Sequence, residues 1–310
     1  MAVSYGKIGV LMGGLSSERE ISLKSGKAVL EALEASGVEA VAIDIKTEDK
    51  EENIRLIRSR KITCAFIALH GRFGEDGQIQ EILEAIKLPY TGSGVKASRL
   101  GMDKIASKKI FAHAKLHVPD FIELDKHSYT PDFSADGLRW PLVVKPAAHG
   151  SSIGLSIIDK REDLAGALEI AFNYDDKAVI EEYIQGREMT VGILGQRALP
   201  VIEVVPKKRF FDYDCKYKQG LTEYIVPARI EVKLAKKLQQ AAKQAHKLLD
   251  CFGCSRVDLI LSKDNLAYVL ELNSIPGFTS TSLLPKAARQ EGIEFPQLCL
   301  KLIEFAYAKK

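Results

Sequence analysis

The chain has 310 residues, of which 46% are hydrophobic and 27% are charged, and its formal net charge is +3. Such a composition is typical of a globular protein, and the length predicts about two domains, or three smaller ones, each able to bury a core. The slight positive charge gives no support to nucleic acid or a membrane surface as the main partner, but it leaves small anionic ligands open.

The apolar runs and the cysteines bear on the compartment. The first apolar run is too short for the core of a signal peptide, and no apolar stretch approaches the ~18 residues of a membrane span. An odd number of cysteines, 5, fits reduced thiols better than a disulfide framework, so we expect a cytoplasmic protein. Cys251 and Cys254 form a lone C-x-x-C pair, for which ordinary packing is a simpler expectation than a zinc or redox site.

The N-terminal part of the chain alternates short apolar runs with helical patterns. The runs "KIGVLM", "EAVAID" and "CAFIALH" predict strands, and the segments "REISLKSGKAVLEALEASG" and "GQIQEILEAIK" predict helices. This alternation indicates a parallel α/β sheet, which places ligands beyond the carboxyl ends of its strands. Two polar loops are expected at that edge, "GGLSSERE" and "HGRFGEDG".

The rest of the chain predicts two further domains of mixed helices and strands. A helix is expected at 98–116, followed by the strands "PLVVKP" and "GLSIID", the helix "REDLAGALEIAF" and the strand "AVIEEYI". Beyond Met189, the strands "MTVGIL" and "LPVIEVV", a long polar loop, a helix at 231–249 and two more strand patterns indicate antiparallel pairing. We therefore expect domains at 1–98, 99–184 and 185–310.

Residues 143–156, "VVKPAAHGSSIGLS", place a lysine at the end of an apolar run and small residues after it. The backbone N–H groups of such a loop can form an anion-binding concavity, and the Lys145 ammonium adds positive charge. The order differs from that of a P-loop, in which the lysine follows the glycines. A phosphate cradle and a plain Gly/Ser turn between two strands are both open from this stretch alone.

A second candidate site lies on the predicted hairpin "RVDLILSKDNLAYVLELN", residues 256–273. If Asp264 and Asn265 form a two-residue turn, each pair of facing residues has numbers that sum to 529. The side chains of Arg256, Asp258, Glu271 and Asn273 then share one face of the hairpin, and those of Val257, Leu259, Leu270 and Leu272 take the other.

Two facing carboxylates repel each other unless a cation lies between them. Asp258, Glu271 and the amide oxygen of Asn273 are hard ligands of the kind that Mg²⁺ prefers, and Mg²⁺ held by few protein ligands usually binds substrate phosphates as well. This face therefore predicts a magnesium site that acts on a phosphate donor. A solvated sheet face that carries an Arg–Asp pair is the alternative.

Several segments, in order over nearly the whole chain, carry a closer resemblance. They are "GGLSSEREISLKSG", "HGRFGEDGQIQ", "YTGSGVKASRLGMDK", "VVKPAAHGSSIGLS", "FFDYDCKYKQGLTEY", "GCSRVDLIL" and "ELNSIPGFTSTSLLP". In these segments the chain closely resembles the D-alanine:D-alanine ligases of the ATP-grasp superfamily. The resemblance implies an ATP-grasp fold, α/β with an α+β C-terminal part: three domains, a parallel N-terminal α/β domain, and ATP held between two antiparallel sheets.

The resemblance also implies the metal and oxyanion sites. Asp258, Glu271 and Asn273 are implied to hold two Mg²⁺ ions, with Glu271 bridging them, and Mn²⁺ is an expected substitute. Arg256 and the backbone N–H of Gly277 are implied to meet the oxyanion of a tetrahedral intermediate, which preorganised donors stabilise.

The ATP contacts are implied in the same way. The residues concerned are Lys104, Lys145, Ser151, Ser152, Glu181, Glu182, Tyr183, Ile184, Glu188 and Lys216. The lysines would contact the phosphates, the serine loop would close over them, the backbone of 181–184 would line adenine, and Glu188 would bind the ribose hydroxyls. Periodicity alone predicts a solvated strand edge for these glutamates.

The first D-alanine is implied to lie beside Glu18, whose carboxylate would hold the ammonium together with Ser151 and Tyr217. The neighbouring Ser17 and Glu20 have the spacing of a capping box, so Glu20 is expected to serve the helix alone. His70 ends a predicted strand, where a structural histidine and one beside the first substrate are both open.

The implied reaction starts when the carboxylate of the first D-alanine attacks the γ-phosphoryl group and forms an acyl phosphate. Lys216 and Arg256, with magnesium, would neutralise charge and hold the groups in line. The amine of the second D-alanine then attacks the acyl carbon, while Ser282, the N–H of Leu283 and Lys216 hold its carboxylate. Because acyl phosphates hydrolyse in water, we expect a lid at 207–223, with a disordered surface loop as the alternative.

The dipeptide product would serve peptidoglycan synthesis, and the resemblance implies a homodimer. A ligase that takes D-lactate or D-serine as second substrate is the near alternative, and a catalytically inactive ATP-binding regulator is a further one. The segment "GSGVKA" prompts a distant alternative, an NAD-dependent oxidoreductase, but it follows only a weak strand pattern. His149 departs from the resemblance, since many ligases of this family carry glutamate there; we expect it to alter pH dependence rather than abolish activity.

Overall fold

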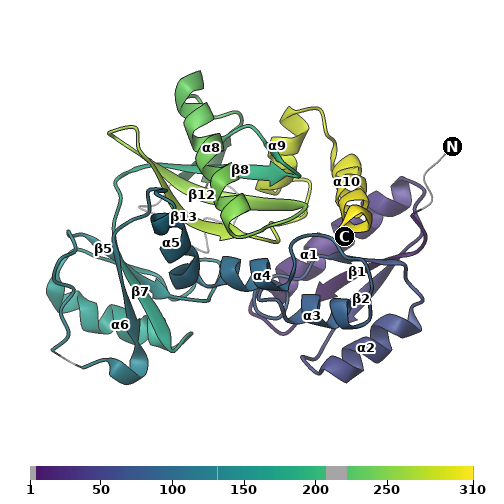
Figure 1. Cartoon of the computed structure of the whole chain (residues 1–310), viewed down its shortest axis with the longest axis horizontal. Helices are drawn as coiled ribbons and strands as arrows, with labels where there is room; N and C mark the ends of the chain where they lie inside the picture. Colours follow the sequence, from purple (N-terminus) through teal and green to yellow (C-terminus); the bar gives the residue numbers. More distant parts are fainter. Residues whose placement is uncertain (1–4, 131, 207–221, 310) are drawn as a thin grey trace.

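A computed structural model describes residues 5–130, 132–206 and 222–309 of the chain. The predicted lid at 207–223 therefore lies almost wholly outside the described residues, as do Lys216 and Tyr217. Within the described part, one parallel sheet and two antiparallel sheets are covered by helices (Figure 1). No helix in these ranges has the length and apolar character needed to cross a membrane.

The N-terminal sheet is parallel, with strand order β2-β1-β3, which confirms the prediction from the alternating pattern. Every residue of β1 is buried, as expected for a parallel strand covered on both faces. The polar loops after β1 and β3 leave the same edge of the sheet because the two strands are parallel neighbours. Its elements are β1 (Ile8–Gly13), α1 (Arg19–Ala35), β2 (Ala40–Ile45), α2 (Lys50–Ser59), β3 (Cys64–Ile67) and α3 (Gln78–Ala85).

The helix predicted at 98–116 is in fact two helices, α4 (Val95–Met102) and α5 (Lys104–His113). Asp103 separates them in an extended conformation, with φ −82° and ψ 100°. Its carboxylate accepts hydrogen bonds from the backbone N–H groups of Ile105 and Ala106, which have no partner within the helix. Asp103 therefore ends α4 and caps the start of α5 as a separate helix.

The central sheet is antiparallel, with strand order β4-β7-β5-β6, and α6 packs on one of its faces (Figure 1). Its other side meets α5 through a small cluster of Ile105, Ala147 and Val179. Strand β4 was not among the predicted strands. The elements are β4 (Phe121–Asp125), η1 (Lys126–Ser128), β5 (Leu142–Pro146), β6 (Ser156–Ile158), η2 (Arg161–Asp163), α6 (Leu164–Phe172) and β7 (Lys177–Glu182).

The C-terminal sheet is also antiparallel, in the order β11-β10-β8-β12-β13, and β9 pairs with β8. Helix α8 lies across one face of it and buries Leu238, Ala242 and Ala245 in the core. The elements are β8 (Gly186–Leu194), β9 (Arg197–Ala198), β10 (Ile202–Pro206), β11 (Thr222–Ile225), α8 (Val232–Leu248), β12 (Cys254–Ser262), β13 (Ala267–Asn273), α9 (Leu283–Gln290) and α10 (Phe295–Ala308).

The β12–β13 hairpin has the predicted pairing at one end only. Asp258 faces Glu271 and Arg256 faces Asn273, as expected, but Leu259 faces Val269. The predicted two-residue turn is wrong, because the backbone N–H of Asn265 donates to the carbonyl of Ser262 and the chain needs one residue more to reverse. A β-bulge at Leu270 takes up this extra residue, so Leu270 borders a cavity instead of the core.

The C-terminal helices pack against the N-terminal sheet. One core cluster contains Leu11 and Leu33 from the N-terminal elements together with Leu298 and Leu302 from α10. Figure 1 shows α10 beside α1. The N-terminal sheet and α10 therefore share one core, and the domain limits at 98/99 and 184/185 remain predictions.

Candidate active site

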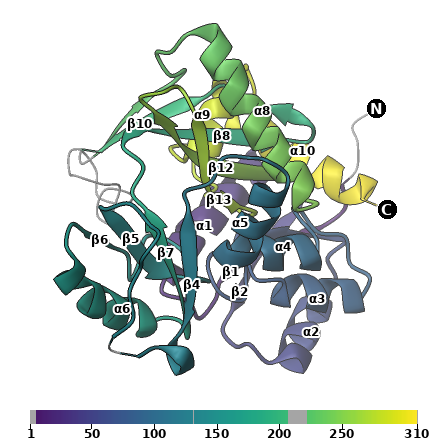
Figure 2. The same cartoon turned by 60° about the vertical axis from the view of Figure 1, so that its left-hand side comes forward.

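A cavity of about 350 Å³ lies between the central and C-terminal antiparallel sheets. Figure 2 shows these two sheets, which contain β5 and β7 on one side and β8, β12 and β13 on the other. Of the residues predicted from the resemblance to bind ATP or metal, the following line it: Lys104, Lys145, Ser152, Glu181, Glu182, Tyr183, Ile184, Glu188, Asp258 and Glu271. The fold thus brings together segments that lie up to about 170 residues apart in the chain.

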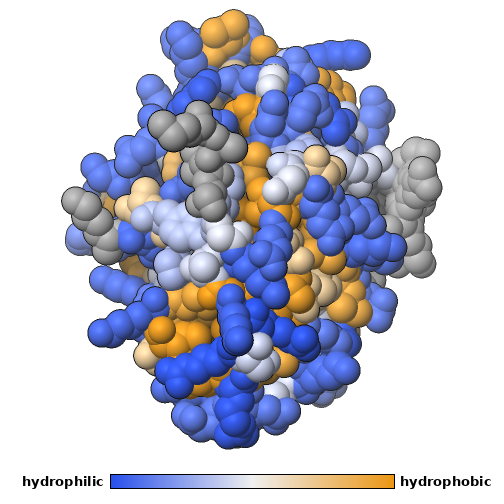
Figure 3. Space-filling view, turned by 90° about the vertical axis from the view of Figure 1, so that its right-hand side faces the viewer, coloured by the Kyte–Doolittle hydropathy of each residue, from blue (hydrophilic) through white to orange (hydrophobic). Residues whose placement is uncertain are grey.

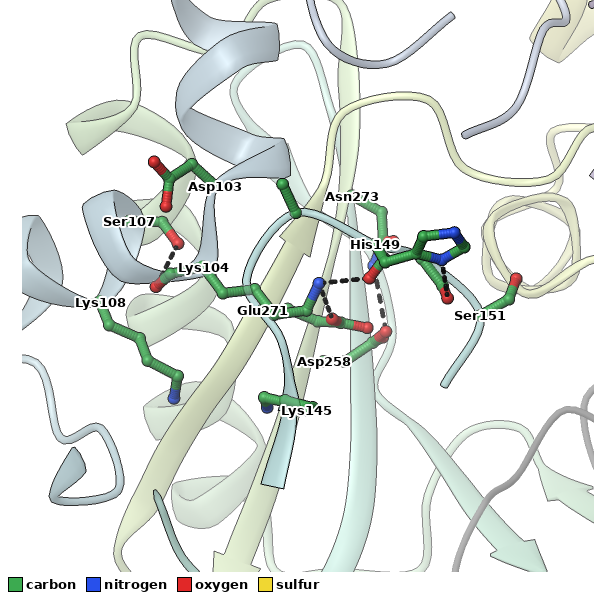
Figure 4. A network of polar contacts seen from close by, with 12 residues as sticks. Asp103, Lys104, Ser107, Lys108, Lys145, His149, Ser151, Asp258, Glu271 and Asn273 are labelled. Carbon is green, nitrogen blue, oxygen red and sulfur yellow. Dashed lines mark hydrogen bonds and ion pairs between the residues drawn. The ribbon is translucent and has the colours of Figure 1, made fainter. Parts of the chain in front are cut away.

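Two lysines and the loop after β5 form one part of the cavity wall. Lys104, the first residue of α5, donates to the carbonyl of His149 at 2.6 Å, and its ammonium lies 3.7 Å from Glu271 (Figure 4). Lys145, at the end of β5, donates to Glu181 at 2.6 Å. Both lysines are buried to more than nine-tenths, so their positive charge is concentrated in a poorly solvated space.

The strand end at 181–184 forms another part of the wall. Glu181 and Glu182 are both buried, whereas periodicity alone predicted a solvated edge for them. Glu182 accepts hydrogen bonds from the backbone and guanidinium of Arg139, and these bonds hold the pKa of its carboxyl below the ordinary value. Strand β7 ends at Glu182, and the next two residues, Tyr183 and Ile184, line the cavity.

The hairpin face gathers the predicted metal ligands around Asp258. Its carboxylate accepts two hydrogen bonds from the guanidinium of Arg256, at 2.9 and 2.7 Å, and one from the amide of Asn273 at 3.1 Å. Among the described residues, no three His, Cys, Asp or Glu side chains form a metal-binding group. Two carboxylates and one amide oxygen fit Mg²⁺ that completes its shell with phosphate oxygens, not a cation held by protein alone.

Several cavity residues were not predicted. Thr190 donates to Asp258 at 2.6 Å, and it lies two residues from Glu188 on the same face of β8, an alternation that the sequence does contain. Arg187 and Glu203 form an ion pair across β8 and β10, for which the sequence contains no local sign. Leu270 borders the cavity only because of the bulge in β13.

The loop after β5 reaches the N-terminal domain. Ser151 and Ser152 both have φ of +57°, a left-handed conformation that is unfavourable for two consecutive non-glycine residues. The hydroxyl of Ser151 donates to the carboxylate of Glu18, and the predicted pairing of these residues is therefore present. A side chain on Gly71 would come within 2.8 Å of the same carboxylate, so the loop after β3 also closes around it.

The start of α1 differs from the prediction. The helix begins at Arg19 with Glu18 as its N-cap residue, and no side chain caps it. The capping box predicted for Ser17 and Glu20 is therefore wrong. The turn is instead formed by Ser16, whose hydroxyl accepts from the Glu18 backbone N–H at 3.2 Å and donates to the carbonyl of His70 at 2.7 Å.

His70 is 5% exposed and lies in a polar group at the edge of the N-terminal sheet. One ring nitrogen contacts the hydroxyl of Ser25 at 3.0 Å, and the other lies 3.4 Å from Glu75. Burial raises the pKa of the Glu75 carboxyl above its ordinary value. His70 is thus held by partners on both sides, as a structural histidine would be, and its ring is fixed close to the loop that carries Glu18.

The remaining predicted residues lie where β13 leads into α9. Ser282 is the N-cap residue of α9, Leu283 is its first residue, and the Ser282 hydroxyl accepts from the backbone N–H of Thr279 at 3.1 Å. A side chain on Gly277 would come within 2.9 Å of that hydroxyl. A helix N-terminus next to a glycine presents unpaired backbone N–H groups, which favour an anion.

Comparisons with known proteins agree with this arrangement. Residues 7–54 and 47–93 match the family model for the D-ala D-ala ligase N-terminus, and residues 110–304 match that for the D-ala D-ala ligase C-terminus. The chain is 47% identical, over 98% of its length and 96% of the relative's, to a D-alanine–D-alanine ligase of Geotalea uraniireducens (strain Rf4).

Solved structures show the same fold. A D-alanine–D-alanine ligase from Bacillus anthracis complexed with ATP matches with a TM-score of 0.86 and 34% identity over 98% of both chains. The VanG D-Ala:D-Ser ligase from Enterococcus faecalis matches with a TM-score of 0.83 and 31% identity, over 97% of this chain and 99% of that one. The family models, the full-length relatives and the ATP-grasp fold agree, and the chain belongs to the D-alanine–D-alanine ligase family.

Proposed function

We propose that this ligase joins two molecules of D-alanine into D-alanyl-D-alanine and converts ATP to ADP and phosphate. The observation that carries the proposal is the cavity between the two antiparallel sheets, where Lys104 lies 3.7 Å from Glu271. This pair of adjacent positive and negative side chains suits a nucleotide whose phosphates contact the lysine and whose metal contacts the carboxylate. Membership of the ligase family supports the same reaction.

ATP is proposed to lie along the cavity with its adenine at the backbone of 181–184. Glu188 would bind the ribose hydroxyls, Lys104 and Lys145 would contact the phosphates, and the Ser151–Ser152 loop would cover them. The crystal structure of the Bacillus anthracis relative was obtained with ATP, which supports nucleotide binding in a chain of this fold. The left-handed conformation of the two serines supports a loop that closes over its ligand.

Asp258, Glu271 and Asn273 are the residues that would hold Mg²⁺ or, as a substitute, Mn²⁺. When bound, the metal would neutralise charge on the transferring phosphoryl group. In the described structure, the guanidinium of Arg256 donates to the Asp258 carboxylate. We propose that Arg256 exchanges this contact for the developing oxyanion, together with the backbone N–H of Gly277.

The carboxylate of the first D-alanine would attack the γ-phosphorus and give an acyl phosphate, with ADP as the leaving group. Glu18 and Ser151 would hold its ammonium, with His70 nearby. The amine of the second D-alanine would then attack the acyl carbon, and inorganic phosphate would leave. The helix N-terminus at Ser282 and Leu283 would hold the second carboxylate. Lys216, Tyr217 and the 207–223 lid keep their predicted roles but lie outside the described residues.

The test is a coupled assay of ADP release with D-alanine alone and with D-alanine plus D-serine or D-lactate. We expect ADP release, and a dipeptide product by mass spectrometry, with D-alanine alone. The match to a D-Ala:D-Ser ligase shows that this fold also accommodates D-serine, so the second substrate is decided by a few side chains and needs this comparison. No ADP release with D-alanine, but release when D-lactate or D-serine is added, would overturn the proposal.

We further propose that the enzyme acts in the cytoplasm as a homodimer and supplies peptidoglycan synthesis. Figure 3 shows hydrophobic side chains among hydrophilic ones on the side of the molecule that lies at the right in Figure 1. Tyr307, 43% exposed, belongs to α10. The monomer mass is 34.2 kDa, and light scattering on the purified chain should give twice that value.

A further inference from the structure

Lys108 is a fully buried lysine behind the cavity, with 0% of its surface exposed. It lies one helical turn after Lys104 on α5, and Figure 4 shows the two side chains leaving that helix toward the site. Its ammonium forms an ion pair with Glu181 at 2.8 Å and lies 5.8 Å from the centre of the Phe121 ring. Among the described residues, the cavity is lined by Glu181 and Lys145 but not by Lys108.

This position is unfavourable for a lysine. Lys104 and Lys108 are like charges four residues apart near the N-terminus of a helix, where the helix dipole also repels cations. Burial lowers the pKa of Lys108 to about 8, although the charge of Glu181 opposes this effect. A buried ion pair adds little stability compared with apolar side chains of the same volume. Packing alone therefore gives no reason for an ammonium at this place.

Glu181 is shared by two lysines. Lys145 donates to one carboxylate oxygen at 2.6 Å, and Lys108 lies 2.8 Å from the other. Burial raises the pKa of Glu181, but the two ammonium groups outweigh it and hold the pKa below the ordinary value. The carboxylate is therefore charged, and with 3% of its surface exposed it cannot be left without a cation.

The two lysines differ in what they can reach. Lys145 borders the cavity and can turn toward a bound nucleotide, whereas Lys108 has no access to it. If Glu181 had Lys145 as its only cation, any movement of Lys145 toward phosphates would leave a buried carboxylate unpaired. That cost would weaken the binding free energy of every ligand that must contact Lys145.

We propose that Lys108 is a positioning residue for nucleotide binding, which keeps Glu181 paired so that Lys145 is free to contact the phosphates. This inference rests on the proposed role of Lys145 in ATP binding. Lys108 touches neither the nucleotide nor the reacting atoms. Its effect is confined to ligands that carry phosphates, because adenosine does not require Lys145 to leave Glu181.

The test compares dissociation constants for ATP, ADP and adenosine by isothermal titration calorimetry, in the absence of D-alanine. For Lys108→Met we expect ATP and ADP to bind about tenfold more weakly, as for the loss of one charged hydrogen bond, while adenosine changes less than about twofold. Lys108→Arg keeps the charge and should recover part of the loss. Lys109→Met is the matched control, since Lys109 is the next residue of the same helix and its side chain is 57% exposed.

A double variant, Lys108→Met with Glu181→Gln, separates charge pairing from packing. It removes both partners of the ion pair, so the preference for ATP over adenosine should return to within about threefold of the original chain. It also keeps the inference testable if Lys108→Met alone does not fold. A double variant that still lacks the preference would overturn the inference.

Other outcomes are equally decisive. If Lys108→Met lowers the melting temperature and weakens ATP and adenosine binding by the same factor, Lys108 is only structural and the inference is wrong. If the original chain binds no adenine nucleotide, the inference and the proposed function both fall. If it binds ATP but forms no dipeptide from D-alanine, only the proposed reaction falls.

Discussion

The hydroxyl of Ser151 donates a hydrogen bond to the carboxylate of Glu18, across a separation of 133 residues in the chain. One residue belongs to the loop after β5 and the other to the turn before α1, so the contact joins the central sheet to the N-terminal domain. Glu18 is 7% exposed, and a buried carboxylate needs such donors. The loop after β5 is therefore joined to the N-terminal domain through this buried carboxylate.

Glu18→Gln should impair the use of the first D-alanine. The amide keeps the size of the side chain but removes the charge that would hold the substrate ammonium, and a charged hydrogen bond contributes about 1.5–3 kcal/mol. We expect kcat/KM for D-alanine to fall about 10- to 100-fold, with ATP affinity unchanged. Glu20→Gln, two residues on and exposed, is the control. Unaltered D-alanine kinetics in Glu18→Gln would show that the Glu18 carboxylate does not bind the first D-alanine.

Arg256→Ala should slow turnover while ATP still binds. Loss of one oxyanion donor lowers kcat about 100- to 1000-fold in enzymes that use such donors. Steady-state ADP release and calorimetric ATP binding measure the two effects separately. Arg289→Ala, at an arginine whose side chain is 52% exposed, is the control. Turnover equal to that of the original chain would show that Arg256 does not stabilise the oxyanion.

His149→Glu should change the pH dependence of the reaction rather than abolish it. The His149 ring borders the cavity and contacts the edge of the Tyr174 ring at 5.4 Å between centroids. A histidine gains positive charge as the pH falls, whereas a glutamate does not. The profiles of kcat/KM for ATP against pH should therefore differ between the original and variant chains. Exposed His127→Gln is the control, and coincident profiles for His149→Glu would refute the prediction.

His246 should make the fold less stable in acid. Burial lowers the pKa of His246 to about 4, and its ring contacts the hydroxyl of Ser255 at 2.7 Å. The unfolded chain binds this proton near pH 6.5 and the folded chain only near pH 4, so stability falls as the pH drops between these values. The expected loss from this group is about 2 kcal/mol at pH 5.

Urea unfolding at pH 7.5 and pH 5 measures this loss. His246→Gln is expected to be less stable at both pH values, because it disturbs a buried hydrogen bond, but to show a smaller difference between them. His113→Gln, at an exposed histidine of α5, should keep the full difference. A His246→Gln chain with the original pH dependence would assign the acid sensitivity to other groups.

The sequence predicts most of the strands and long helices because the spacing of apolar residues within each segment is typical of that element. The runs that became β1, β3, β5 and β12 are buried almost throughout, and such runs are recognisable without tertiary context. The break at Asp103 was missed because the helical pattern continues on both sides of it. Strand β4 was missed because it is only partly buried and lacks a continuous apolar run.

Only part of the candidate site could be predicted from local sequence patterns. Asp258 was placed opposite Glu271 from a two-residue turn that the structure does not have, and the pairing is present because the bulge at Leu270 compensates for the longer turn. The contacts of Lys108 with Glu181 and of Thr190 with Asp258 join residues about 70 positions apart, and no local pattern encodes them. Such contacts depend on how two sheets meet, which only the folded chain specifies.

The bulge at Leu270 separates two functions of one hairpin. Between the bulge and Asn273, β12 and β13 keep the pairing that aligns Asp258 with Glu271, while β12 runs along β8 without interruption from Cys254 to Ser262. The alignment of the acidic residues is therefore set by the β12–β13 pairing on the Asn273 side of the bulge and not by the turn. Insertions or deletions at the hairpin tip can therefore reshape that end of the cavity without separating the two carboxylates.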